Sequence, residues 1–211
     1  MELDEAMRST GTCRYYRPDP IPDAACSTAF DAARFAPQGG NRQPVRWIVV
    51  RDRALKQALA DLYLPHWEAY FGSSTVVSNA RGTTASAADH FAHHLVDVPA
   101  LLVLCAEIEA LHPTDAALDR VSVVGGASIY PTMQNVCLAL RDRGVATAVT
   151  TLLCREEPAV KELLGVPDGF LTAAHVAAGY PERPFPRKLS RASVEETVSL
   201  DRFDRPLFGS V

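Results

Sequence analysis

The sequence predicts an α/β or α+β sandwich, in which helices cover the faces of a sheet. Four runs rich in β-branched, aromatic or small apolar residues are typical of buried strands, and segments with apolar residues at helical spacing separate them. The 211 residues suffice for one large domain, and a hydrophobic fraction of 47% is ordinary for a globular protein. The strand order cannot be read from this pattern.

The net charge and the cysteine positions exclude several classes of protein. The net charge of −4 argues against sequence-independent nucleic-acid binding, so any phosphate must be held by a few placed cations. The five cysteines are scattered without CxxC spacing, which predicts reduced core thiols. The chain starts with acidic residues and no apolar run, and its longest uncharged apolar stretch, 98–106, is too short to span a membrane. We therefore expect a soluble, cytoplasmic protein without a membrane or nucleic-acid partner.

The first elements are helical, with an extended connector between them. Residues 2–8 predict a short amphipathic helix. The segment RYYRPDPIPD carries prolines at alternate positions, which predicts extended backbone. Pro22 then opens a helix that continues to about Ala36, where small residues at helical spacing imply close packing against another backbone.

Two strands flank a helix and a segment without clear periodicity. VRWIVV predicts a buried strand, and leucines at helical spacing predict a helix over 52–63. Residues 64–88 have the composition of a mobile loop, which together with a helical turn near 89–95 forms a predicted lid over about 64–95. The run ALLVLCA predicts the second strand.

The remaining elements alternate in the same way. SIYPTMQNVCLALRDRG predicts a helix ending at Gly144, and REEPAVKELLGV a helix ending at Gly165. VATAVTTLL and FLTAAHVAAGY predict strands. Residues 181–211 are polar and rich in proline, which predicts an extended arm that needs another surface to lie on. The division is therefore a domain over 1–180 and a C-terminal extension over 181–211.

The strongest local signal is the segment APQGGNRQP between a helix and a strand. Gly39 and Gly40 let the backbone approach a ligand closely. Asn41 and Gln43 each offer a donor and an acceptor, as gripping the edge of a heterocycle requires. A helix-to-strand turn with polar side chains explains the spacing equally well, so the spacing alone leaves both interpretations open.

The order of these residues resembles the AP-S-G-G-N-x-Q-P-W loop of the nitroreductase-like flavoproteins. Gln38 replaces the usual Ser, and Val45 the usual Trp. Four further landmarks follow in the family's order and extend the resemblance from Arg8 to Leu200: RSTGTCRYY with DPIP, the Gln134-Asn135 helix ending at Gly144, LLGVP at 163–167, and AGYP at 178–181.

The resemblance implies an α+β fold with a mixed sheet sandwiched by helices. It also implies an intertwined homodimer, with flavin mononucleotide (FMN) in clefts at the dimer interface and the arm 181–211 lying over the partner. The family's phosphate ligands correspond to Thr12 and Arg14. Thr10 and Gly11 stand at the family's two arginine positions, so either Arg8 substitutes or backbone N–H groups do more of the work. In the arm, the basic pair corresponds to Lys188 and Arg191.

The resemblance places further residues against the flavin ring and the ribityl chain. Residues Pro37, Gln38, Gly39, Asn41 and Gln43 would meet them. Thr150 and Thr151 would lie against the flavin, with a backbone N–H toward N5, although β-propensity alone explains two threonines there. The cofactor-binding set also includes Gln134, whose amide otherwise links its helix to neighbouring backbone.

Two other chemistries are weighed and set aside. His90, His93 and His94 have spacing that could present imidazoles to a metal, but no acidic or cysteine ligand accompanies them. We therefore expect no metal and assign these side chains to a polar helix face or interface. The absence of GxSxG and GxGxxG motifs argues against a serine hydrolase and a Rossmann domain.

The resemblance implies an FMN-dependent oxidoreductase that uses NADH or NADPH. Hydride would pass through flavin N5 in a ping-pong cycle to a nitroaromatic, a quinone or another small conjugated acceptor, without a catalytic side chain. Trp67, Tyr70 and Phe71 in the lid would determine what stacks on the flavin, although ordinary core packing also explains aromatic residues there. The alternatives are a protein that holds FMN without efficient turnover and, from another class, a non-redox α/β binding or hydrolytic domain.

Overall fold

The computed structural model describes residues 1–72, 83–187 and 189–207. Its centre is one four-stranded sheet in the order β1-β2-β4-β3, with antiparallel pairing between every pair of neighbouring strands. The strands are β1 (Val45–Val50), β2 (Ala100–Glu107), β3 (Ala146–Thr150) and β4 (Phe170–Gly179). The predicted strands are therefore confirmed, and β1 coincides with VRWIVV.

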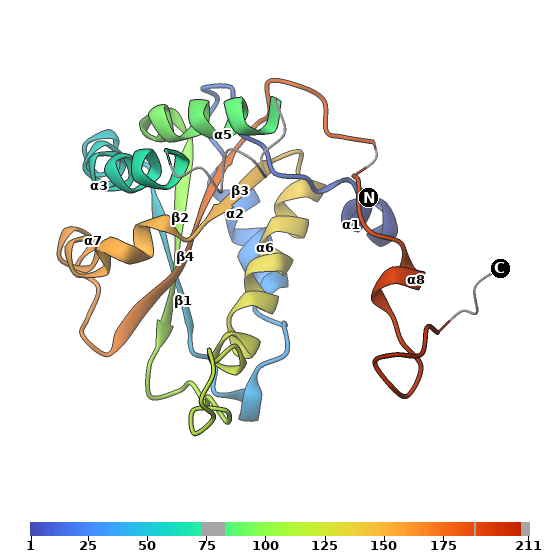
Figure 1. Ribbon diagram of the computed structural model, residues 1–211. Coiled ribbons are helices and arrows are strands. Elements are labelled where there is room, and N and C mark those ends of the chain that lie inside the picture. The colour runs from blue at the N-terminus through green and yellow to red at the C-terminus, as the bar shows by residue number, and fades with distance from the viewer. Residues whose placement is uncertain (73–82, 188, 208–211) are drawn as a thin grey trace.

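Helices cover both faces of this sheet, as Figure 1 shows. The long helices α2 and α6 pack on one face, and α3, α5 and α7 pack on the other. The bounds are α1 (Leu3–Ser9), α2 (Asp23–Ala33), α3 (Arg53–Phe71), α5 (Thr83–His93), α6 (Tyr130–Asp142), α7 (Glu157–Leu164) and α8 (Val194–Thr197). The predicted α+β sandwich is confirmed.

The core follows from the position of β2 in the middle of the sheet. Leu101 and Val103 contribute to the cluster with α3, α5 and α7, whereas Ala100 and Leu102 contribute to the cluster with α2 and α6. A strand buried on both faces needs a continuous apolar run, which ALLVLCA supplies. Among the cysteines, Cys26, Cys105 and Cys137 are buried, and burial raises the pKa of the Cys105 thiol to about 11.

The mixed sheet that the resemblance implied is corrected to an antiparallel one. The only parallel pairing among the described residues is an isolated bridge between Thr12 and Thr147. The N-terminal segment meets the outer edge of β3 at this one pair, so it does not form a fifth strand.

The predicted helix over 52–63 ends earlier than the observed helix α3. Asp52 caps α3 by accepting a hydrogen bond from the Leu55 N–H, and the helix continues through Pro65 to Phe71. Pro65 removes one helical hydrogen bond, but Trp67 beyond it is buried and its indole N–H donates to Asp89 on α5 at 2.9 Å. The predicted loop over 64–88 is therefore wrong at 64–71 and from 83 onward, and 73–82 lie outside the described residues.

Both predicted glycine terminators are confirmed. Gly144 follows α6 with φ of +75°, and Gly165 ends α7 with φ of +67°. These left-handed conformations favour glycine because a Cβ would be strained there.

The chain after β4 is extended and exposed, as predicted, and it leads to α8 away from the sheet (Figure 1). Its exposed apolar side chains are Val194, Val198, Leu200, Phe203 and Leu207. Where the arm leaves the body, Phe185 lies under the guanidinium of Arg141, with 3.6 Å from Cζ to the ring centroid. In the part of the chain that is described, no helix has the length and apolarity to cross a membrane.

Candidate functional site

The N-terminal segment 11–16 runs between the edge of β3 and the chain that follows β4. The Cys13 N–H donates to the Thr147 carbonyl at 2.9 Å, and the Glu182 N–H donates to the Tyr15 carbonyl at 3.2 Å. The Tyr16 hydroxyl donates to the Cys13 carbonyl at 2.7 Å, and burial holds the pKa of Tyr16 well above its usual value. Backbone contacts on both sides therefore fix this segment, and Thr12 and Arg14 with it.

A cavity of about 200 Å³ opens beside this segment. Thr12 and Arg14 line it, and so do Arg183 and Phe185 from the arm. The charged side chains among its lining residues are Arg14 and Arg183, both cationic. Two guanidinium groups, a hydroxyl and exposed backbone are a donor set suited to phosphate.

The other predicted phosphate ligands lie elsewhere or outside the described residues. Arg8 is exposed on α1 and forms an ion pair with Asp4 at 2.8 Å. Arg191 is exposed in the arm and donates to the neighbouring Ser190 carbonyl. Lys188 lies outside the described residues. Of the predicted cations, the structure therefore brings Arg14 to the cavity, and it adds Arg183, which the sequence reasoning missed.

The segment 37–43 forms a second, differently built region. Asn41 and Gln43 adopt positive φ of +54° and +52°, a conformation uncommon for residues other than glycine, and Gly40 between α2 and β1 has φ of +60°. Strained backbone of this kind is concentrated at ligand sites. The Gln43 amide lies 3.4 Å from the Asn41 side-chain oxygen, so the two amides lie side by side.

A second cavity, of about 440 Å³, adjoins this segment. It is lined by Pro37, Gln38 and Gly39 on one side and by residues of the loop before α6 on the other. The Gly39 N–H donates to the Ser128 hydroxyl at 2.9 Å, which fastens the two sides together. The side-chain oxygen of Gln38 is buried and has no hydrogen-bond partner among the described atoms. A buried amide oxygen without a partner, on a residue that lines a cavity, is a group that a ligand with N–H donors would satisfy.

These two regions lie at opposite ends of the sheet (Figure 1). Thr12 lies beside Thr147 of β3, which pairs with Ala178 of β4, and Ala178 pairs with Ala100 at the start of β2. Gln43 lies two residues before Val45 of β1, which pairs with Ala106 near the end of β2. Six residue steps along β2 and three strand spacings from β1 to β3 separate them by about 25 Å. Helix α6 gives the same result: near its start Ser128 bonds Gly39, and near its end Arg141 bonds Ser9. A ligand that contacts both regions of one chain would have to bridge most of this distance.

The predicted residues at the end of β3 lie on the side of the sheet covered by α3. Thr150 is half-buried, and its contact with the Tyr63 hydroxyl partly offsets the rise in the Tyr63 pKa that burial causes. Thr151 is exposed at the point where β3 ends. Gln134 is exposed on α6 and lines neither of the two cavities.

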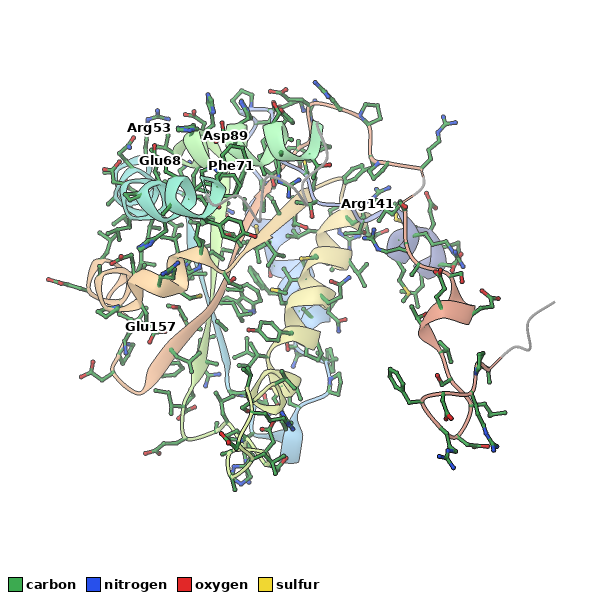
Figure 2. All side chains as sticks on the ribbon, viewed as in Figure 1. Arg53, Glu68, Phe71, Asp89, Arg141 and Glu157 are labelled. Carbon is green, nitrogen blue, oxygen red and sulfur yellow. The ribbon has the colours of Figure 1, made fainter. Side chains whose placement is uncertain are left out.

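The three aromatic residues expected in a lid belong to α3. Trp67 is 8% exposed, stacks on Phe71 with ring centroids 5.3 Å apart, and forms part of the core. Phe71 and Asp89 lie where α3 and α5 meet (Figure 2). Tyr70 is 49% exposed, so it presents the most accessible ring of the three.

The histidine cluster does not converge on one point. His90 stacks on Tyr15 with ring centroids 4.4 Å apart and on His94 at 4.0 Å, and burial lowers the pKa of His90. His93 lies 3.6 Å from Asp89. His90 and His94 lie on the helix face beside the N-terminal segment, and His93 lies on the exposed side with Asp89.

Comparisons with known proteins agree with this fold. The model of the nitroreductase family matches residues 7–180. An NADH dehydrogenase/NAD(P)H nitroreductase of Archaeoglobus fulgidus is 26% identical over 172 residues, covering 80% of this chain and 79% of the relative. An NADH dehydrogenase of Thermus thermophilus is 28% identical over 194 residues, covering 80% and 81%. Among solved structures, iodotyrosine deiodinase bound to FMN and 3-iodo-L-tyrosine superposes with a TM-score of 0.71 at 21% identity, covering 96% and 99%.

Proposed function

The chain belongs to the nitroreductase family, and from that premise we propose that it is an FMN-dependent oxidoreductase. It takes electrons from NADH or NADPH and passes them to a small conjugated acceptor such as a nitroaromatic or a quinone. Its A. fulgidus relative carries the description NADH dehydrogenase/NAD(P)H nitroreductase, which supports the choice of electron donor.

The observation that carries the proposal is the complementary chemistry of the two ends. One end offers Thr12 and Arg14 to a phosphate. At the other end Gln38 lines the second cavity, Gln43 lines a neighbouring one together with Gln38, and the amide of Asn41 lies 3.4 Å from that of Gln43, so this segment can offer amides to a heterocycle edge. FMN has a phosphate at one extremity and a pyrimidine edge with donors and acceptors at the other. The donor sets therefore fit the two parts of this cofactor.

The separation of about 25 Å between these ends supports a homodimer. If two copies pack with opposite ends together, each Arg14 meets the Asn41 segment of the partner subunit, which completes two equivalent sites. The exposed apolar side chains of the arm, Phe203 and Leu207 among them, favour a covered position on that partner.

The roles of the chain's own residues follow from this placement. FMN, when bound, supplies the two-electron carrier that a ping-pong cycle between NAD(P)H and an acceptor requires. Arg14 and Thr12 hold the phosphate and so fix the position of the ring. The amides of Asn41 and Gln43 orient the pyrimidine edge and stabilise negative charge there. The backbone at Thr151 would contact the ring, and Tyr70 on α3 would contact the acceptor.

Absorbance of the purified chain, after incubation with FMN and gel filtration, tests the proposal. We expect a flavin spectrum that NADH or NADPH bleaches under anaerobic conditions and that a quinone restores. Arg14→Gln should lower the amount of FMN retained. Arg17→Gln is the matched control, because Arg17 lies three residues further on, pairs with Asp19 and does not line the cavity.

Two outcomes would contradict the proposal in different ways. A chain that retains no flavin would be a non-redox α/β domain. A flavin spectrum that neither nucleotide bleaches would indicate a protein that holds FMN without turnover.

A further inference from the structure

The phosphate segment of this chain is crowded at Gly11, one of the two positions where the family resemblance implied an arginine. At Gly11, an added Cβ would lie 3.0 Å from Cγ of Pro186 and 3.1 Å from Cδ2 of Leu189. A side chain at this position therefore requires Pro186 and Leu189 of the arm to shift by a few tenths of an ångström. Thr10, at the other of the two positions, donates its hydroxyl to the Ala6 carbonyl and closes the end of α1.

The same arm that fills this space brings a different cation to the cavity. Arg183 lines the cavity with Thr12 and Arg14, and its guanidinium carbon lies 5.2 Å from the ring centroid of Tyr15. This contact holds an otherwise exposed side chain against the phosphate segment.

The path of the arm past the cavity is fixed at a second point. Arg141, labelled in Figure 2, stacks its guanidinium on Phe185 and donates to the Ser9 hydroxyl at 3.0 Å. It thereby joins the arm, α6 and α1 two residues beyond Arg183. Arg8, the N-terminal cation expected as a substitute, is already paired with Asp4 outside the cavity lining.

We propose that Arg183 is the second phosphate-binding cation of this protein, in place of an arginine in the N-terminal segment. The inference rests on the proposed FMN function and adds a residue to that site. With Arg14 from the N-terminal segment and Arg183 from the arm, the phosphate is held between two segments far apart in the sequence. Binding of a phosphorylated flavin would then hold the start of the arm, near Arg183, against the domain.

Flavin fluorescence quenching gives the Kd for FMN and for riboflavin, which lacks the phosphate. Arg183→Gln should weaken FMN binding by about tenfold to a hundredfold and leave riboflavin binding unchanged, because a charge-assisted bond to phosphate is lost. Arg183→Lys, which keeps the charge, should restore part of the FMN affinity. The matched control is Arg187→Gln, which removes an exposed arm cation that does not line the cavity, and its Kd for FMN should equal that of the wild type.

The remaining results would overturn the assignment. Equal losses for FMN and riboflavin in Arg183→Gln would show a structural role without phosphate contact. A loss in Arg8→Gln with none in Arg183→Gln would return the role to the N-terminal cation. If wild-type protein quenches the fluorescence of neither flavin, the proposed function is wrong and this assignment with it. If FMN binds tightly and Arg183→Gln does not change its Kd, the assignment alone is wrong.

Discussion

His175 lies in the middle of β4 with no exposed surface, and neither ring nitrogen has a hydrogen-bond partner among the described residues. It pairs with Val103 on one side and Thr150 on the other, so it stands near the end of β3 that carries Thr151. Burial lowers the pKa of the His175 imidazole from 6.5 to about 4. The folded chain therefore keeps this side chain neutral at a pH where the unfolded chain protonates it.

This burial predicts an acid sensitivity with a defined window. Below pH 6.5 the His175 imidazole of the unfolded chain binds a proton, whereas in the folded chain it stays neutral until the pH approaches 4. The free energy of unfolding therefore falls as the pH drops toward 4. The contribution of this residue is about 3 kcal/mol over the window. Urea unfolding of His175→Leu between pH 7 and 4.5 should show a smaller fall than the wild type. Substituting the exposed His112 by Leu should leave the wild-type fall, and an unchanged slope in His175→Leu would contradict the explanation.

Part of the candidate site could be proposed residue by residue, because the residues concerned lie in short segments. The glycines and amides of 39–43 indicated one region and Thr12 and Arg14 the other, and their roles stay predictions. Arg183 gave no local signal, because its role depends on Gly11 leaving space for Pro186 on a distant segment. The nearest hint was the combination of a missing arginine at Gly11 and a basic, proline-rich arm.

At the scale of the elements, helix ends were predictable where a glycine decides them, and α7 is the clearest case. Gly165 adopts a left-handed conformation, and the Val166 N–H closes the last turn on the Lys161 carbonyl at 2.9 Å. The added Cβ at this position would meet no atom within 4 Å, so its cost is backbone strain alone.

Gly165→Ala should therefore lower the free energy of unfolding by about 1 kcal/mol, since alanine must adopt the left-handed conformation. Gly169→Ala is the matched control, because its Cβ also meets no atom within 4 Å and its φ is not in the left-handed range. Chemical denaturation of both variants measures the difference. Equal stabilities would show that the terminator does not depend on the glycine.

The far half of α3 shows where prediction from local pattern fails. The composition of residues 64–88 indicated a loop, yet the helix continues through Pro65 to Phe71, because Trp67 packs into the core and its indole N–H donates to Asp89 on α5. That partner lies 22 residues further along the chain. Strand order and the separation of the two cavities were likewise unreadable, since both depend on pairings between distant segments.

The whole molecule places its two candidate regions near the two ends of α6. The proposed function requires a ligand to contact the cations of one region and the amides of the other, which is why it includes a second copy of the chain. The arm is exposed in the described chain, with Phe203 fully accessible to solvent.

The proposed site between two subunits predicts that two inactive variants complement each other. Arg14→Glu and Asn41→Ala should each abolish FMN retention in a homogeneous preparation, because every shared site then contains one lesion. Unfolding and refolding the two variants together should restore about a quarter of the wild-type FMN content, since half of the randomly paired dimers carry one undamaged site of two. Absorbance per protomer measures this complementation. No recovery on mixing would place the whole flavin within one protomer.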